Sequence, residues 1–145
     1  MHEIQSIMKQ VAMSLNYIHK RGLVHSNLLP SNILIKNGTV VLCDFCLPRF
    51  FRPGSLQSDR DPEKMGYISP ESLKGAKTSM KSDVYSFGAI LSELLQRKKP
   101  PKECVHPIDI ESCPKELEAI VLRSLSSNEE ERPSISEIIS ILSFE

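Results

Sequence analysis

The spacing of apolar residues near the start of the chain predicts an amphipathic helix. Between Glu3 and Lys20 these positions recur at steps of three and four residues: Ile4, Ile7, Met8, Val11, Leu15 and Ile18. This period places them on one face of a helix. Gly22 is typical of a residue just beyond a helix end, so we expect the helix to stop there.

Two short apolar runs follow, Ile33 to Ile35 and Val40 to Cys43. The dipeptide Asn37-Gly38 lies between them, and it is a strong short-range signal for a tight turn between antiparallel strands. The pattern therefore predicts a small two-stranded hairpin.

The second half of the chain predicts three further helices. We expect Ser82 to cap the first, Pro114 to precede the second, and Ser134 with Glu137 to form a capping box at the start of the third. Their apolar positions are Val84, Phe87, Ile90, Leu91, Leu94 and Leu95, then Leu117, Ile120, Val121 and Leu125, and finally Ile135, Ile138, Ile139 and Leu142. The first set covers more than one helical face, which predicts deep burial.

The stretch from Leu47 to Lys81 has no sustained period and is rich in Pro, Gly, Ser, Asp and Arg. A long segment of this composition is typical of a functional or mobile loop. The expected fold is therefore mainly α-helical, with one hairpin and one long irregular segment.

Composition narrows the functional classes. With 145 residues and 40% hydrophobic content, the chain is expected to form one soluble domain, and no apolar run is long enough for membrane insertion. Basic and acidic residues number 18 each, so no global field recruits nucleic acid. The first ten residues lack a signal-peptide pattern, so we expect a cytoplasmic protein with free thiols.

The tetrapeptide CDFC, which contains Cys43 and Cys46, raises the alternatives of a metal site and a redox pair. Cys104, His106 and Cys113 are suitable further zinc ligands, but they lack the usual paired spacing. A redox pair normally lies at a helix N-terminus, which lowers the thiol pKa, whereas Cys43 ends a predicted strand. Both hypotheses are disfavoured.

A third interpretation comes from the order of short motifs. The loop from His25 to Asn32, then Asp44-Phe45, then Ser69 to Glu71 resembles the protein-kinase series H-R-D-L-x-x-x-N, D-F-G and A-P-E. Further on, the stretch from Asp83 to Gly88 and the pair Arg132-Pro133 are similar to later motifs of that family. The resemblance covers nearly the whole chain and is closest to tyrosine-kinase-like Ser/Thr kinases.

The resemblance implies a kinase C-lobe, a helical bundle with a small hairpin, over residues 1–145. Residues 44–71 would then form its activation-type segment. The chain contains no glycine-rich phosphate loop and no V-A-I-K lysine, so we expect a C-lobe fragment in which the N-lobe is absent. Phosphoryl transfer depends on those missing parts for positioning and charge.

The resemblance also implies that central catalytic groups are lost. Asn27 stands where the family has its catalytic aspartate, and Leu29 stands where it has a lysine. An amide cannot act as a carboxylate base, and leucine offers no charge to a transferring phosphate. Ser26 replaces an arginine that commonly receives an activation-loop phosphate, and Lys64 replaces a threonine that contacts the catalytic groups.

Some cofactor-binding positions are retained. Asn32 and Asp44 match the family's two magnesium ligands, and Leu34 matches the residue beneath the adenine. Alternatively, Asn32 and Asp44 simply satisfy backbone groups of their own loops, which we favour. We therefore expect no cofactor beyond weak Mg-ATP binding.

Five residues are assigned structural roles by the resemblance. His25 and Phe45 match core spine positions, and Glu71 is expected to pair with Arg132. Asp83 is expected to accept hydrogen bonds from backbone amides of the His25 loop.

The leading functional hypothesis is an inactive kinase-like domain, a pseudokinase, that acts in signalling by protein binding, scaffolding or allosteric regulation. Its expected partners are proteins, such as another kinase or an N-lobe supplied in trans, and not nucleic acid. One alternative is a divergent Ser/Thr kinase that binds ATP and phosphorylates proteins when an N-lobe is present. Another is a truncated, non-functional gene product. Asn27 and Leu29 bear on this choice, because added sequence can restore a lobe but not a missing base.

Overall fold

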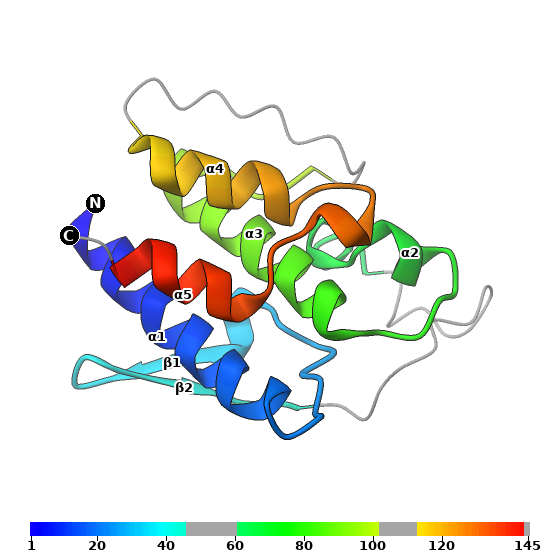
Figure 1. Ribbon diagram of the computed structural model, residues 1–145, viewed down its shortest axis with the longest axis horizontal. Coiled ribbons are helices and arrows are strands. Elements are labelled where there is room, and N and C mark those ends of the chain that lie inside the picture. The colour runs from blue at the N-terminus through cyan, green and yellow to red at the C-terminus, as the bar shows by residue number, and fades with distance from the viewer. Residues whose placement is uncertain (46–60, 102–112, 144–145) are drawn as a thin grey trace.

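A computed structural model describes residues 1–45, 61–101 and 113–143 of the chain. These residues form helices, one hairpin and three short 3-10 turns (Figure 1). The helices are α1 (His2–His19), α2 (Pro70–Leu73), α3 (Met80–Gln96), α4 (Lys115–Ser124) and α5 (Ile135–Ser143). The strands are β1 (Ile33–Lys36) and β2 (Thr39–Leu42), and the turns are η1 (Pro30–Asn32), η2 (Met65–Tyr67) and η3 (Glu129–Glu131). The predicted mainly helical fold with a small hairpin is confirmed.

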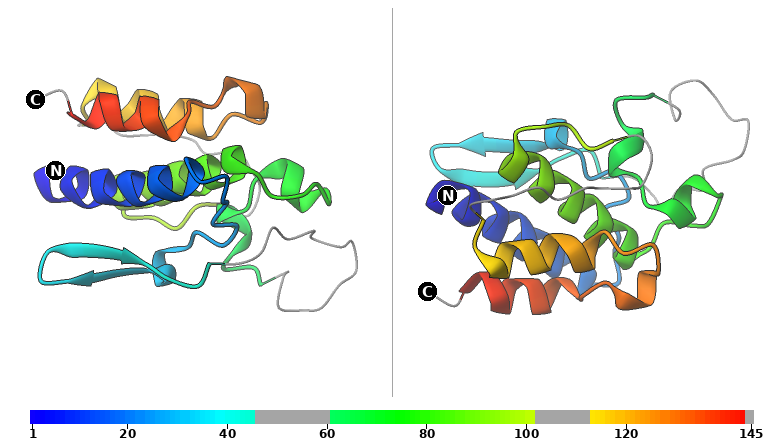
Figure 2. Two further views of the ribbon diagram at one scale, coloured as in Figure 1. Left: turned by 60° about the horizontal axis from the view of Figure 1, so that its bottom comes forward. Right: turned by 90° about the horizontal axis from the view of Figure 1, so that it is seen from above.

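The elements are arranged in three layers (Figure 2, left). Helices α4 and α5 form one outer layer, α1 and α3 form the middle layer, and the hairpin lies on the opposite side. The middle helices pack against both neighbours, since α1 contacts α5, α3 and β2, and α3 contacts α4. The core therefore lies around α1 and α3.

Helix α1 buries the apolar stripe expected from its sequence. Met8, Val11 and Leu15 have no exposed side-chain surface, and Ile18 is almost fully buried. The same stripe continues to His19, four residues after Leu15, which is also buried. A buried imidazole needs hydrogen-bond partners, and they are described with the site below.

The hairpin has the predicted turn. Asn37 and Gly38 both have positive φ, at 51° and 77°, which is the requirement of the type I′ turn that Asn-Gly favours. The strands pair antiparallel with Leu34 opposite Val41. The Gln10 side chain of α1 binds this hairpin twice, because its Nε2 donates to the Gly38 carbonyl and its Oε1 accepts from the Val40 amide, both at 3.0 Å.

Helix α3 begins one turn earlier than predicted. Its N-cap is Ser79 rather than Ser82, and Ser82 is instead the third helical residue of a capping box. The Ser79 hydroxyl accepts from the Ser82 amide, and the Ser82 hydroxyl accepts from the Ser79 amide. Either serine can cap a helix, so sequence did not choose between them.

The expected burial of α3 holds over most of its length. Val84, Phe87, Ile90 and Leu91 are at most 2% exposed, whereas Leu94 is 37% exposed near the end of the helix. The last turn of α3 therefore lies at the surface.

Helices α4 and α5 follow their predicted patterns. At the start of α5 the Glu137 carboxylate accepts from the Ser134 amide at 2.7 Å, and the Glu137 amide donates to the Ser134 hydroxyl at 3.3 Å. This is the expected capping box. Helix α4 packs closely on α3 at Gly88, where an added Cβ would lie 2.5 Å from Cβ of Ser124.

Where it is described, the long segment without a period contains only the short elements η2 and α2 before α3 begins at Met80. Residues 47–60 of that segment lie outside the described part. None of the helices in the described residues is long and apolar enough to span a membrane.

Candidate functional site

The loop from His25 to Asn32 is anchored by Asp83, in the first turn of α3. The Asp83 carboxylate is almost completely buried. Its Oδ2 accepts from the His25 amide at 2.8 Å, and its Oδ1 accepts from the Ser26 amide at 2.9 Å. These are the backbone contacts expected for Asp83. Because charge-assisted hydrogen bonds to amides compensate for burial, this carboxylate fixes the start of the loop on the core.

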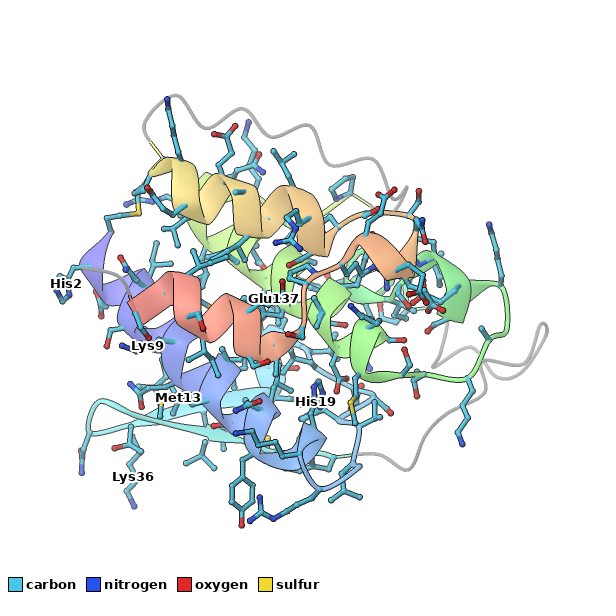
Figure 3. All side chains as sticks on the ribbon, in the orientation of Figure 1. His2, Lys9, Met13, His19, Lys36 and Glu137 are labelled. Atoms are coloured by element: carbon cyan, nitrogen blue, oxygen red, sulfur yellow. The ribbon has the colours of Figure 1, made fainter. Side chains whose placement is uncertain are left out.

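The sequence did not predict a further partner of Asp83, the side chain of His19. Nε2 of His19 lies 2.8 Å from Oδ2 of Asp83, which links the end of α1 to the beginning of α3 (Figure 3 labels His19). The only signal for it in the sequence was the position of His19 on the apolar stripe of α1. Its partner lies 64 residues away, beyond the reach of local pattern.

His25 is held in one tautomer by its neighbours. Its Nδ1 accepts from the Asn27 amide at 3.2 Å, so its Nε2 carries the proton and donates to the Cys43 carbonyl at 3.1 Å. Burial lowers the pKa of His25, against opposing effects of Asp83 and the Cys43 carbonyl. Both ring nitrogens are therefore occupied by the backbone, which favours a structural role over that of a general base.

Phe45 lies beside His25 but is not a fully buried residue. The two ring centroids are 4.5 Å apart, and 53% of Phe45 is exposed. The expectation of a core position is thus met on one side only. Leu34 and its cross-strand partner Val41 are also about half exposed, so the hairpin carries an apolar surface.

The two asparagines of the loop are joined by a backbone contact. Nδ2 of Asn32 donates to the Asn27 carbonyl at 2.7 Å. Nδ2 of Asn27 lies a longer 3.4 Å from the Asp44 carbonyl. Asn32 is buried, so its amide helps to fix the loop, as the favoured interpretation of this residue expects.

The fit to magnesium is partial. With its nitrogen used by Asn27, Asn32 keeps its Oδ1 for a metal, and Asp44 lies beside the loop, where its backbone carbonyl is 3.4 Å from Nδ2 of Asn27. Mg²⁺ prefers such oxygen ligands and commonly takes the remainder from water and nucleotide phosphates. No group of three or more His, Cys, Asp or Glu residues able to hold a metal occurs in the described parts of the chain.

The zinc and redox hypotheses gain no support. Cys46, Cys104 and His106 lie outside the described residues. Partial burial and the neighbouring Asp44 carboxylate raise the pKa of the Cys43 thiol, which is the opposite of redox activation. Cys113 is a free cysteine whose pKa is likewise raised by burial.

Leu29, Ser26 and Lys64 occupy positions where the resemblance predicts lost catalytic or regulatory groups, and each makes other contacts in the structure. Leu29 is 7% exposed and belongs to the hydrophobic core. Ser26 adopts a positive φ of 64°, and its hydroxyl lies 2.7 Å from that of Thr78. Lys64 is exposed and precedes η2. The loop therefore keeps its position with a serine at residue 26, an amide at residue 27 and a packed leucine at residue 29.

A buried ion pair ties the end of the activation-type segment to the last third of the chain. Nη1 and Nη2 of Arg132 donate to Oε1 and Oε2 of Glu71 at 2.7 and 2.8 Å. Arg132 also donates to the carbonyls of Lys81 and Ser126. Burial alone would raise the pKa of Glu71, but the hydrogen bonds and charge of Arg132, together with hydrogen bonds from the backbone amide of Glu71 and from Ser69, outweigh it and the pKa is lowered. The pair expected from the sequence is therefore present in the structure.

Tyr67, in η2, makes another contact that sequence reasoning missed. Its hydroxyl donates to the Glu93 carboxylate at 2.5 Å, and burial together with this contact raises the pKa of Tyr67. Ser86 donates to the Tyr67 carbonyl at 2.7 Å. These bonds fasten the segment after Lys64 onto α3.

The loop, this segment and the first turns of α3 enclose a cavity of about 250 Å³. Its wall includes Ser26 to Leu29 from the loop, Lys64 at the edge of η2, and Asp83 and Ser86 from α3. Three elements that are distant in sequence therefore form one concave site around the Asn27 position.

Comparisons with known proteins agree with this arrangement. A family model described as protein kinase domain matches residues 1–142. A dual specificity protein kinase, Ttk, of Danio rerio is 33% identical over 84% of this chain and 15% of its own length. A probable serine/threonine-protein kinase of Dictyostelium discoideum is 28% identical over 94% of this chain and 35% of its own.

A third relative differs in its description. A probable inactive receptor kinase of Arabidopsis thaliana is 39% identical over 61% of this chain and 9% of its own length. The chain thus spans about a third or less of each of these curated relatives. The match over residues 1–142, together with the anchored loop and the Glu71–Arg132 pair, shows that the chain belongs to the protein kinase family.

Proposed function

We propose that this chain is a catalytically inactive, pseudokinase-type C-lobe of tyrosine-kinase-like character that acts in signalling by binding, scaffolding or allosterically regulating another protein. The observation that carries the proposal is the loop itself. Asn27 occupies the base position while every described backbone anchor around it is intact. Such a loop is folded and can bind a partner, but its Asn27 amide cannot act as a base.

The second substitution acts in the same direction. Kinase catalysis relies on positioned charge to stabilise the transferring phosphoryl group. Leu29 is packed in the core rather than directed at a substrate. Restoring a cation at this position would require unpacking a buried side chain, which supports the proposal.

The partner is proposed to be a protein in the cytoplasm, either another kinase or an N-lobe. Leu34, Val41 and Phe45 are each about half exposed at the hairpin side of the molecule. An apolar surface of this kind is typical of an interaction site. The balanced formal charge of the chain favours neither nucleic acid nor an anionic membrane.

The test is phosphoryl transfer by a two-lobe protein that joins this chain to any native N-lobe. We expect no incorporation of radiolabelled phosphate into the protein or a generic substrate above background. The control is Asp44→Ala, which removes the retained carboxylate. Incorporation that disappears in Asp44→Ala would show that the domain is an enzyme.

A divergent Ser/Thr kinase is the second candidate. It is favoured by the retained oxygen ligands Asn32 and Asp44 and by relatives described as serine/threonine or dual specificity kinases. In that case ATP would bind when an N-lobe is present, and a group other than residue 27 would have to take the substrate proton.

A further inference from the structure

The cavity beside Asn27 has a charge pattern that the proposed loss of catalysis does not explain. Among the described residues that line it, only Lys64 and Asp83 carry a charge. Asp83 is 1% exposed, and both of its oxygens accept hydrogen bonds, from His25 and Ser26 amides, with the His19 ring beside one of them. Its negative charge is therefore directed into the core and compensated there.

Lys64 is in the opposite situation. Its side chain is exposed at the edge of the cavity, and within the described residues its ammonium makes no ion pair. An ammonium carries three hydrogen-bond donors and is a common point-charge partner of phosphate. The cavity thus presents an uncompensated cation to whatever enters it.

Asn27 also makes the cavity wall less negative than a carboxylate at this position would. A carboxylate at this position would add a negative charge to the cavity wall and would repel an anion. The amide adds none, and within the described residues its Nδ2 has only the long 3.4 Å contact with the Asp44 carbonyl. Together, Asn27 and Lys64 favour an anionic ligand.

The size of the cavity limits what that ligand is. At about 250 Å³ it is smaller than the roughly 300–1,000 Å³ of sites that take drug-sized molecules. A nucleotide is such a molecule, whereas one modified side chain is much smaller. Ser26, Thr78 and Ser86 make the wall polar, although the Ser86 hydroxyl already donates to the Tyr67 carbonyl and the Ser26 and Thr78 hydroxyls lie 2.7 Å apart.

We propose that this cavity binds a phosphorylated serine or threonine side chain of a partner protein, with the phosphate held by Lys64 and the Asn27 amide. The inference rests on the proposed function, because it requires that residue 27 no longer acts as a base. It goes beyond that function by naming the ligand of the inactive site, a phosphorylated side chain of a partner protein. No bond is made or broken in this binding.

The test is an NMR titration of the isotopically labelled chain with N-acetyl-phosphoserine methylamide. We expect saturable shifts of the backbone amides of residues 26–29 and 64–67. Lys64→Gln and Asn27→Asp should each weaken binding about tenfold or more, as expected for loss of a charge-assisted contact. Lys74→Gln is the matched control, because Lys74 is an exposed lysine that does not line the cavity, and it should bind like the unchanged chain.

Three outcomes would overturn the proposal. One is equal binding by Lys64→Gln, which would show adventitious phosphate contact. Another is equal binding of the unphosphorylated serine or the glutamate analogue. The third is the absence of shifts at phosphoserine concentrations up to about 10 mM, which would exclude a Kd of about 1 mM or tighter. Because phosphoryl transfer is measured separately, failure here leaves the proposed inactivity standing, and transfer activity would refute that inactivity whatever binds.

Discussion

Arg132 and Glu71 lie 61 residues apart in the sequence and meet through two parallel hydrogen bonds of 2.7 and 2.8 Å. The guanidinium is completely buried, and its remaining donors bind backbone carbonyls. Bidentate geometry of this kind is specific to arginine. The contact joins the first turn of α2 to the turn before α5.

The first prediction concerns this pair. Arg132→Met should lower the free energy of unfolding by about 3 kcal/mol, because it leaves the Glu71 carboxylate without its partner in a partly buried site. Urea denaturation would measure the loss. The matched control is Arg123→Met, since Arg123 forms a long, exposed 3.7 Å contact with Glu137, and it should cost less than about 0.5 kcal/mol. Equal losses in the two variants would contradict the role given to the buried pair.

The second prediction concerns pH. His25 has a lowered pKa in the folded chain, so in a window below its ordinary value of 6.5 the unfolded state binds a proton that the folded state does not. The contribution of His25 to the free energy of unfolding is therefore fully present above about pH 6.5. It is lost as the pH falls toward the pKa of His25 in the folded state, with a slope of up to about 1.4 kcal/mol per pH unit. Unfolding curves between about pH 7 and about pH 5 would measure the slope.

His25→Gln is the control for that slope. Glutamine can keep a donor and an acceptor but does not titrate. Its stability should depend less on pH in this window, even if the variant is less stable throughout. An unchanged slope would assign the effect to other groups. Glu71, whose pKa is lowered, contributes in a more acid window, below about 4.5.

The third prediction concerns the contact between α3 and α4. Gly88→Ala would place a methyl group 2.5 Å from Cβ of Ser124, and such overpacking costs about 1–3 kcal/mol. Ser124→Gly should recover part of this loss in the double variant. Thermal unfolding of the single and double variants would measure the coupling, and strictly additive effects would contradict a direct contact.

Ser124 provides a related test. Its hydroxyl is buried and has no hydrogen-bond partner in the described part of the chain. An unsatisfied buried hydroxyl is destabilising, so Ser124→Ala should be neutral or slightly stabilising by the same measurement. A loss above about 1 kcal/mol would indicate that the hydroxyl has a partner.

The fourth prediction concerns nucleotide. With Asn32 and Asp44 as the candidate oxygen ligands named by the motifs, Mg-ATP at about 1 mM should raise the melting temperature of this chain by less than about 1 °C, because stabilisation depends on the ratio of ligand concentration to Kd. Differential scanning fluorimetry with and without Mg²⁺ would measure it. A magnesium-dependent rise of several degrees that Asp44→Ala removes would contradict weak binding.

Much of the fold was predictable because it follows local periodicity. The stripe of α1, the Asn37-Gly38 turn and the Ser134 capping box are short-range signals, and each has the expected structure. The N-cap of α3 was misplaced because Ser79 and Ser82 are both good caps. Local pattern cannot rank two such residues when they belong to one reciprocal motif.

The site was predictable only where the motifs named a partner. The backbone contacts of Asp83 and the Glu71–Arg132 pair followed from the resemblance to kinases. The bonds of Asp83 to His19 and of Tyr67 to Glu93 did not, because they join residues 64 and 26 positions apart and neither pair forms a motif. Phe45 is half exposed although the resemblance assigns it a core position, since residue type alone does not decide burial.

The way Asp83 holds the loop separates architecture from chemistry. Its carboxylate binds the main-chain amides of His25 and Ser26, and main-chain groups are the same whatever side chain follows them. The side chains of residues 26 and 27 could therefore change while these amide contacts stay in place. Such a support allows side chains of the loop to change, one at a time, while the polypeptide path stays in place.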